Sequence, residues 1–242
     1  MSIRLHVETQ LLAGAEMSLP PGAARHAQVR RVQPGDVLNL FDGRGADWPA
    51  EVLSMGRSEV TVRVGEPVAL RSELACAVTL ALGMPANDRM DALVEKASEL
   101  GVAVLQPLLC ERSVLRLDGE RAERKRLHWQ AVAVAACEQS GRARVPVVEP
   151  VRSLQHWLAA GHADGYIEGQ RLLLSPQPDA RPLHETTPGP ALCALSGPEG
   201  GLSPAEEAAA RAAGFAPVGL GPRILRADTA PLALLAWVGL RG

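Results

Sequence analysis

Two glycine-containing segments near the C-terminal end of the sequence hold the residues whose types and spacing best suit chemistry. Residues 195–203 read LSGPEGGLS, and residues 220–230 read LGPRILRADTA. Each segment follows a short apolar run, which predicts a buried strand. Glycine turns after strands free backbone N–H groups for a ligand. We expect both turns to face one small cavity beyond the carboxyl ends of parallel strands, where open α/β sheets bind cofactors.

The first segment carries clear signals for a helix directly after its glycines. Ser203 is a good N-cap, Pro204 suits the first helical position, and Glu206 completes a capping box. Gly214 is placed to end the helix in a left-handed conformation. The second segment predicts the same arrangement, with a strand over 216–220, a Gly-Pro turn and a helix that follows it.

Other reactive residue types exclude several classes of chemistry. The glycines do not have the G-x-G-x-x-G spacing of a first βα turn, and no P-loop lysine follows them. No G-x-S-x-G precedes a histidine, the six histidines show no metal-ligand spacing, and no CxxC pair is present. These exclusions leave metal-free transfer chemistry with a bound organic cofactor.

The elements that would position these segments change in character along the chain. Residues 1 to about 70 show short alternating runs separated by turns, which predict strands. From about residue 74, strands alternate with helices, which indicates a parallel sheet. One helix should bury Met90, Leu93, Val94 and Ala97, and a longer one over 121–138 should bury Leu127, Ala131, Val134 and Ala135.

Composition and charge limit the partners and the compartment. A formal net charge of −2 argues against broad coating by nucleic acid, although a local basic patch remains open. No apolar run is long enough to span a bilayer and no signal core opens the sequence, so we expect a soluble, cytoplasmic protein. The four cysteines lie in apolar surroundings and are expected to be reduced and buried.

The motifs together resemble the RsmE family, bacterial 16S rRNA uridine-N3 methyltransferases of the SPOUT superfamily. Besides the two glycine segments, 96–102 (KASELGV), Arg112-Ser113 and 138–142 (EQSGR) follow the order of the family. Residues 25–43 resemble its N-terminal domain. The resemblance covers nearly the whole chain. The family usually has glutamate where this sequence has Asp228.

The resemblance implies an α/β fold with two domains. Residues 1–71 would form a small PUA-like β-barrel that binds RNA. Residues 72–242 would form a trefoil-knotted SPOUT methyltransferase domain with a mostly parallel sheet, through which the protein forms a homodimer. S-adenosylmethionine would sit in the knot. The implied cofactor-binding residues are Leu174, Ser175, Leu195, Ser196, Gly197, Pro198, Glu199, Gly200, Gly201, Leu220, Gly221, Arg223, Ile224, Leu225 and Ala230.

Methyl transfer to uracil N3 calls for a carboxylate near the departing proton and an arginine near the carbonyl oxygens. The candidates are the arginines Arg142, Arg223 and Arg226 and the carboxylates Glu138, Glu199 and Asp228. Two simpler interpretations remain open: Arg226 and Asp228 as a loop-bracing ion pair, and Glu199 as a cap at the end of the loop.

RNA contact is expected from basic residues outside the glycine segments. The candidates are Arg25, His26, Arg30, Arg31, Lys96 and Arg112. A solvated surface explains the first four equally simply, and Lys96 has an alternative partner in Glu99.

The expected function is S-adenosylmethionine-dependent methylation of a uridine N3 in 16S rRNA, on free rRNA or on the small ribosomal subunit. Two alternatives stay open: a non-catalytic knotted RNA-binding protein, and a methyltransferase acting on tRNA or on another base or ribose atom.

Overall fold

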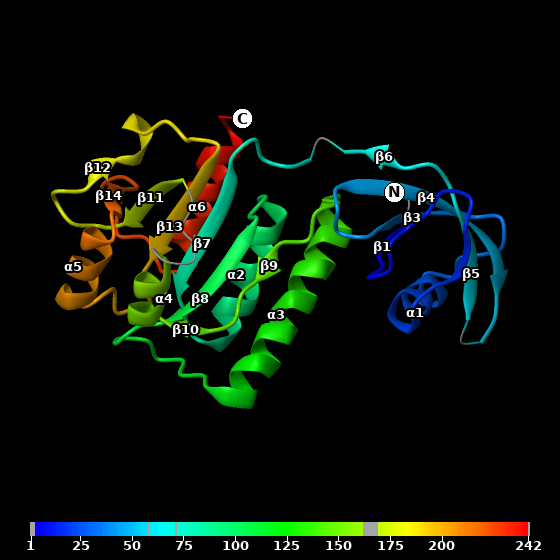
Figure 1. The fold of residues 1–242 in the computed structure, drawn as a ribbon, viewed down its shortest axis with the longest axis horizontal. Coiled ribbons are helices and arrows are strands. Elements are labelled where there is room, and N and C mark those ends of the chain that lie inside the picture. The colour runs from blue at the N-terminus through cyan, green and yellow to red at the C-terminus, as the bar shows by residue number, and fades with distance from the viewer. Residues whose placement is uncertain (1–2, 58, 71, 162–168, 242) are drawn as a thin grey trace. The chain divides into compact units, whose positions relative to one another are not determined.

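The computed structural model describes residues 3–57, 59–70, 72–161 and 169–241 (Figure 1). They form two compact units, one of residues 1–73 with 134–145 and the other of residues 74–133 with 146–242. The predicted domain boundary after residue 71 falls on a residue outside the described part of the chain, and it stays a prediction.

The first unit is a small β domain with one helix. Its elements are β1 (Arg4–His6), β2 (Glu16–Ser18), α1 (Pro21–Val29), β3 (Val37–Phe41), β4 (Ala46–Met55), β5 (Val60–Val64) and β6 (Val68–Ala69). The strand order is β1-β3-β4-β5-β2, with β6 on β4; β1 and β3 are parallel and the other pairs antiparallel. Val60, Val62 and Val64 are buried, as their alternation predicts.

The second unit is an α/β domain. Its strands are β7 (Ala77–Gly83), β8 (Val104–Leu109), β9 (Val147–Val148), β10 (Arg152–Ser153), β11 (Gln170–Leu174), β12 (Arg181–Pro182), β13 (Ala191–Ser196) and β14 (Ala216–Gly219). Its helices are α2 (Asn87–Glu99), α4 (Leu154–Gly161), α5 (Pro204–Ala212), α6 (Thr229–Gly239) and the short η1 (Leu183–Glu185). Helix α3 (Gly119–Ser140) begins in this unit, and its last turns belong to the first.

Every strand pairing of the second unit is parallel among the described residues. The order is β10-β8-β7-β13-β11-β14-β12, and β9 also pairs with β8. Together with the separate N-terminal β domain, this parallel sheet confirms the predicted α/β fold class.

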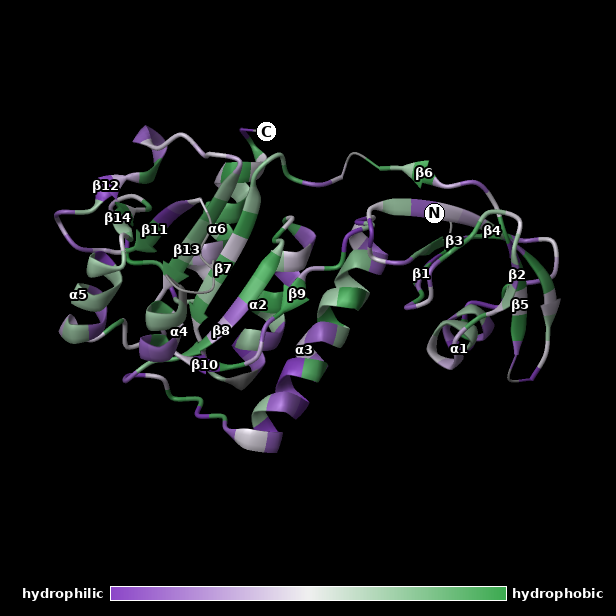
Figure 2. Ribbon diagram, in the orientation of Figure 1, coloured by the Kyte–Doolittle hydropathy of each residue, from purple (hydrophilic) through white to green (hydrophobic). Residues whose placement is uncertain are grey.

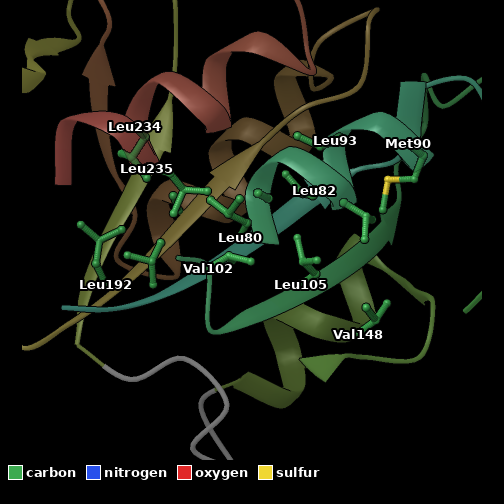
Figure 3. Close-up of a cluster of buried hydrophobic side chains, with 14 of the residues drawn as sticks. Leu80, Leu82, Met90, Leu93, Val102, Leu105, Val148, Leu192, Leu234 and Leu235 are labelled. Carbon is green, nitrogen blue, oxygen red and sulfur yellow. The ribbon is translucent and has the colours of Figure 1, made fainter. Parts of the chain in front are cut away.

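The sheet of the second unit is buried on both faces. On one face Leu80, Leu82 and Leu192 pack with α2, α3 and α6. Figure 3 shows these leucines with those of α2 and α6. On the other, Ala81 and Leu195 pack with α4 and α5. Neighbouring residues of a strand point to opposite faces, so both must be apolar when helices cover the sheet twice. The hydrophobic colour of β7 and β13 in Figure 2 reflects this.

Helix α3 shows where periodicity misleads. Leu127 was expected to be buried and is 53% exposed. The fully buried side chain is Trp129, whose indole N–H donates to Asp91 Oδ1 at 2.8 Å. Ala133 is also buried, whereas the predicted Ala131 and Ala135 are exposed and Val134 is half-buried. Small alanines are spread around this helix, so their spacing does not identify the inner face. In the described part of the chain, no helix is long and apolar enough to cross a membrane.

All four cysteines are free and buried, as expected. Burial raises the pKa of Cys110 and of Cys193 to about 12. Because each pKa lies well above pH 8, only about one thiol in 10⁴ is a thiolate at that pH. We therefore expect these two thiols to resist iodoacetamide at pH 8 in the native protein and to react fully in denaturant. Peptide mass spectrometry measures both states, and rapid native alkylation of either cysteine would contradict the prediction.

Candidate cofactor and active site

A cavity of about 570 Å³ lies in the second unit, beyond the carboxyl ends of β11, β13 and β14. This volume falls in the range of about 300–1,000 Å³ that small-molecule sites occupy. The wall consists of residues 173–177, 196–202, 220–221 and 223–227, with Arg89, Arg112, Glu207, Val218 and Ala230. The two glycine segments therefore meet at one cavity.

Local sequence signals build the first wall as predicted. Ser203 Oγ accepts from the Glu206 N–H, and Glu206 Oε2 accepts from the Ser203 N–H, so the capping box is complete. Gly201 has φ of +68°, and its N–H donates to the Pro198 carbonyl at 2.8 Å. The left-handed backbone favours glycine there and turns the loop back toward α5.

The second glycine segment, which forms the other wall of the cavity, differs from the prediction in one respect. The Gly-Pro turn does not open a helix directly, since α6 begins only at Thr229. Residues 220–228 form an extended loop along the cavity. Gly221 has φ of +101°, and a Cβ added there would meet no heavy atom within 4 Å. The backbone at this turn is thus open to a ligand.

Close backbone packing fixes the glycine loop (residues 197–203) on the sheet. A Cβ on Gly83, at the end of β7, would lie 2.5 Å from both N and Cδ of Pro198. A Cβ on Gly197 would lie 2.9 Å from the Leu202 N. Such contacts leave no space for any side chain. The cavity with its loop backbone therefore fits an elongated organic cofactor that is recognised through N–H and C=O groups.

Glu199 anchors the glycine loop to the start of α2. Its Oε1 accepts from the Ala86 N–H at 2.9 Å and lies 3.7 Å from Arg89 Nη1. A carboxylate at a helix N-terminus satisfies a free N–H group and interacts favourably with the helix dipole. The sequence left a capping role and a reactive role open for Glu199; the cap seen here is on α2, 113 positions earlier, and not on the end of its own loop.

Glutamine at position 199 separates the two interpretations. In Glu199→Gln the amide oxygen still accepts from Ala86, so we expect cofactor affinity and rate within about threefold of wild type. In Glu199→Ala the loop loses its anchor, and cofactor affinity should fall about tenfold. Calorimetry and initial rates measure both. A loss of rate of about 10² in Glu199→Gln would instead identify Glu199 as the proton acceptor.

The second segment places charged groups at the cavity. Arg223 and Arg226 line it and are exposed, and neither forms an ion pair within the described residues. Asp228 precedes α6 and is not part of the lining; its Oδ1 is buried and has no hydrogen-bond partner in the described chain. The loop-bracing pair of Arg226 with Asp228 is not formed.

Glu138 and Arg142 hold the first unit together. Glu138 Oε1 accepts from the His6 N–H at 2.9 Å, and its Oε2 lies 3.6 Å from His26 Nδ1. Arg142 is 3% exposed and forms an ion pair of 2.6 Å with Glu73. Neither residue lines the cavity of the second unit. Their catalytic role stays a prediction.

The residues expected to contact RNA have different surroundings in the structure. Arg25, Arg30 and Arg31 are exposed at or just after α1, and His26 is half-buried on it. Lys96 Nζ lies 2.8 Å from Glu95 Oε1 and 2.7 Å from Glu99 Oε1, so the surface pairing is present, and these carboxylates raise its pKa. Arg112 Nη1 donates to the carbonyls of the glycine loop. RNA contact by these residues stays a prediction.

Most predicted cofactor residues line the cavity. Leu195 does not; it is fully buried against α4 and α5. Sequence reasoning missed Gln177 and Glu207, and it did not assign Arg89 to the cavity. Arg89 and Gln177 follow the carboxyl ends of β7 and β11, so the strand-end rule was the signal that could have found them. No group of three His, Cys, Asp or Glu residues suited to a metal is found among the described residues.

Sequence comparison identifies the class of protein as an RNA methyltransferase, and the parallel α/β fold with a cavity of cofactor size agrees with it. The family described as "RNA methyltransferase domain" matches residues 72–239, and the family described as "RNA methyltransferase PUA domain" matches residues 19–65.

Individual relatives carry one common name. The chain is 33% identical to the ribosomal RNA small subunit methyltransferase E of Synechocystis sp. over 98% of its length and 77% of the relative's. It is 32% identical to that of Bacillus subtilis, over 86% and 83%. A crystal structure of the Neisseria gonorrhoeae protein of the same name, bound to S-adenosylmethionine, superposes with a TM-score of 0.91 at 32% identity and covers 100% of this chain and 98% of that one. The chain belongs to the family of these small-subunit ribosomal RNA methyltransferases.

Proposed function

We propose that this protein transfers a methyl group from S-adenosylmethionine to N3 of a uridine in 16S rRNA. The observation that carries the proposal is the cavity between the two glycine segments, with the exposed Arg223 and Arg226 of the second segment at its wall, in a chain of this family. The Neisseria gonorrhoeae structure, in which S-adenosylmethionine is bound, supports the choice of cofactor.

The cofactor supplies a methyl group on a positively charged sulfur. The residues of this chain would hold and shield it. Backbone groups of 174–175, 196–201 and 220–225 form the cradle, and Glu199 keeps the first loop against α2. Alignment by a rigid cradle is the main contribution that a displacement reaction needs from a protein.

Arg226 and Arg223 are the groups we assign to the uracil. As N3 loses its proton, negative charge develops on the two flanking carbonyl oxygens, and a guanidinium at that point lowers the barrier. Asp228 is the carboxylate that the motif assigns to the departing proton; it directly follows the cavity-lining Ala227, and its Oδ1 is buried. The side chain is one methylene shorter than the family's usual glutamate.

Residues 1–71 are proposed as the RNA-binding domain and residues 72–242 as the methyltransferase domain. Arg25, Arg30 and Arg31, which are exposed, would contact phosphates with His26, and Lys96 would do so by leaving its carboxylate partners. We further propose a homodimer formed through the methyltransferase domain and a cytoplasmic location. Sedimentation equilibrium tests the dimer, and a monomer at micromolar concentration would contradict it.

Two measurements test the proposed activity. Calorimetry should detect binding of S-adenosylmethionine to the purified protein. Mass spectrometry of 16S rRNA from cells with and without the gene should show an N3-methyluridine only in the former. If the cofactor binds and 16S rRNA is unchanged while tRNA loses a methyl group, the substrate assignment is wrong. An unchanged methylation pattern throughout would favour a non-catalytic RNA-binding protein.

A further inference from the structure

The turn after β8, residues 110–113, is fixed by hydrogen bonds within itself. Ser113 Oγ accepts from the Cys110 N–H at 3.0 Å, and the Ser113 N–H donates to the Cys110 carbonyl at 3.1 Å. Ser113 and Cys110 are buried, whereas Arg112 between them is exposed. The turn therefore presents one arginine from a fixed backbone.

That arginine holds the glycine loop. Arg112 Nη1 donates to the Gly200 carbonyl at 3.0 Å and to the Leu202 carbonyl at 3.2 Å. The aliphatic part of the side chain packs on the loop as well, because a Cβ added to Gly200 would lie 3.0 Å from the Arg112 Cβ. The Nη1 amino group thus donates to two carbonyl oxygens, one on either side of Gly201.

A second contact joins the same two segments. Glu206 Oε1 accepts from the Glu111 N–H at 2.8 Å, while its Oε2 accepts from the Ser203 N–H at 2.9 Å. The turn at 110–113 therefore fastens both the loop and the start of α5. At the other side, Glu199 fastens the loop to Ala86.

The arrangement has a thermodynamic consequence for any ligand of this loop. Gly200 and Gly201 have wide conformational freedom, so without restraint the loop would sample many shapes. A ligand that needs one shape would then bear the ordering cost, which lowers its affinity. Restraint by Arg112 removes that cost in advance. A guanidinium that contacts RNA phosphate would instead change RNA binding and leave the cofactor unaffected.

We propose that Arg112 is a positioning residue that presets the glycine loop for S-adenosylmethionine, and that RNA recognition is not its main role. The proposal rests on the proposed function for the identity of the cofactor. Arg112 fixes the shape of the glycine loop through two carbonyl groups, and this shape sets the affinity for the cofactor. The chemical step depends instead on residues of the second glycine segment, 220–230.

The test compares Arg112→Met with Arg112→Lys and with the matched control Arg116→Met. Arg116 is exposed on the same connection. Within the described residues its side chain donates to the Glu111 carbonyl and to no atom of residues 197–203, so its loss removes the same charge and leaves the contacts to the loop in place. Calorimetry is done with S-adenosylmethionine in the absence of RNA. We expect Kd to rise about tenfold in Arg112→Met, by less in Arg112→Lys, which still donates to a carbonyl, and to stay within about twofold in Arg116→Met.

Steady-state kinetics gives an independent measure. In Arg112→Met the KM for S-adenosylmethionine should rise about tenfold, with kcat at saturating cofactor within about threefold of wild type. The KM of RNA should change equally in Arg112→Met and Arg116→Met, because each loses one charge. Thermal melting checks the fold, and if Arg112→Met does not fold, the reduced affinity of Arg112→Lys carries the test.

The outcomes separate the two proposals. If Arg112→Met binds the cofactor as tightly as the wild-type protein does, the proposed role of Arg112 is wrong and the proposed function still stands. A larger loss of RNA affinity in Arg112→Met than in Arg116→Met, at unchanged cofactor affinity, would also overturn it and assign Arg112 to RNA. Wild-type protein without cofactor binding overturns the proposed function and this role with it.

Discussion

Alanine at position 83 is expected to weaken S-adenosylmethionine binding at least about 100-fold, because the added carbon and the cofactor loop cannot occupy the same space. The new Cβ would lie 2.5 Å from Pro198 N and 2.9 Å from the Gly197 carbonyl carbon. These are backbone and ring atoms of the cavity wall, so no flexible side chain can move aside. The loop must shift as a whole, and the unfolding free energy should fall by about 1–3 kcal/mol.

The matched control is Gly22→Ala in α1. A Cβ at Gly22 meets no heavy atom within 4 Å, and its φ lies outside the left-handed region. Alanine in a helix is favoured over glycine by about 0.5–1 kcal/mol, so this variant should melt at the same or a higher temperature and bind the cofactor normally. Calorimetry and thermal melting of both variants provide the comparison. Cofactor affinity in Gly83→Ala equal to wild type would show that the packing of β7 on residues 197–198 does not set the cavity.

The sequence predicted the cavity well because its main determinants are local. Ser203 and Glu206 lie three residues apart, and a capping box needs only that spacing and a free helix end. The glycine turns follow strands of a parallel sheet, so their convergence follows from the strand-end rule without knowledge of distant contacts.

Residues whose partners are far away in the chain could not be assigned this way. The motif predicted a catalytic role for Arg142 but did not indicate that its guanidinium pairs with Glu73, 69 positions earlier. Glu138 likewise receives a hydrogen bond from His6, 132 positions earlier. A charged residue in a motif has no sequence signal that distinguishes an internal ion pair from a reactive group. Only the fold supplies the partner.

The same argument applies to the contacts that hold the glycine loop. Glu199 and Arg112 are visible in the sequence as motif residues, but their acceptors and donors are backbone groups of Ala86, Gly200 and Leu202. Backbone groups carry no residue identity, so neither composition nor spacing indicates them. Arg223 and Arg226 in the second glycine segment differ from these residues, because neither forms an ion pair within the described part of the chain.

Arg226→Ala is expected to lower kcat by about 10²–10³ while cofactor affinity stays within about threefold, because the lost charge acts on the uracil rather than on the cradle. The Arg226 carbonyl accepts from the Thr229 and Ala230 N–H groups at 3.0 Å each, so the start of α6 fixes its backbone. Arg223 lies farther from that helix, in the middle of the loop, and Arg223→Ala should lose less, about tenfold. Single-turnover rates at saturating cofactor and RNA isolate the chemical step.

Arg226→Lys retains the charge but not the planar fork and should recover part of the rate. Equal losses of rate in the two alanine variants would indicate that both arginines only attract RNA electrostatically. Because salt screens such attraction, the difference in rate between each variant and wild type would then become smaller as the salt concentration is raised. A loss in Arg226→Ala that persists at high salt and saturating RNA would place the guanidinium at the reacting base.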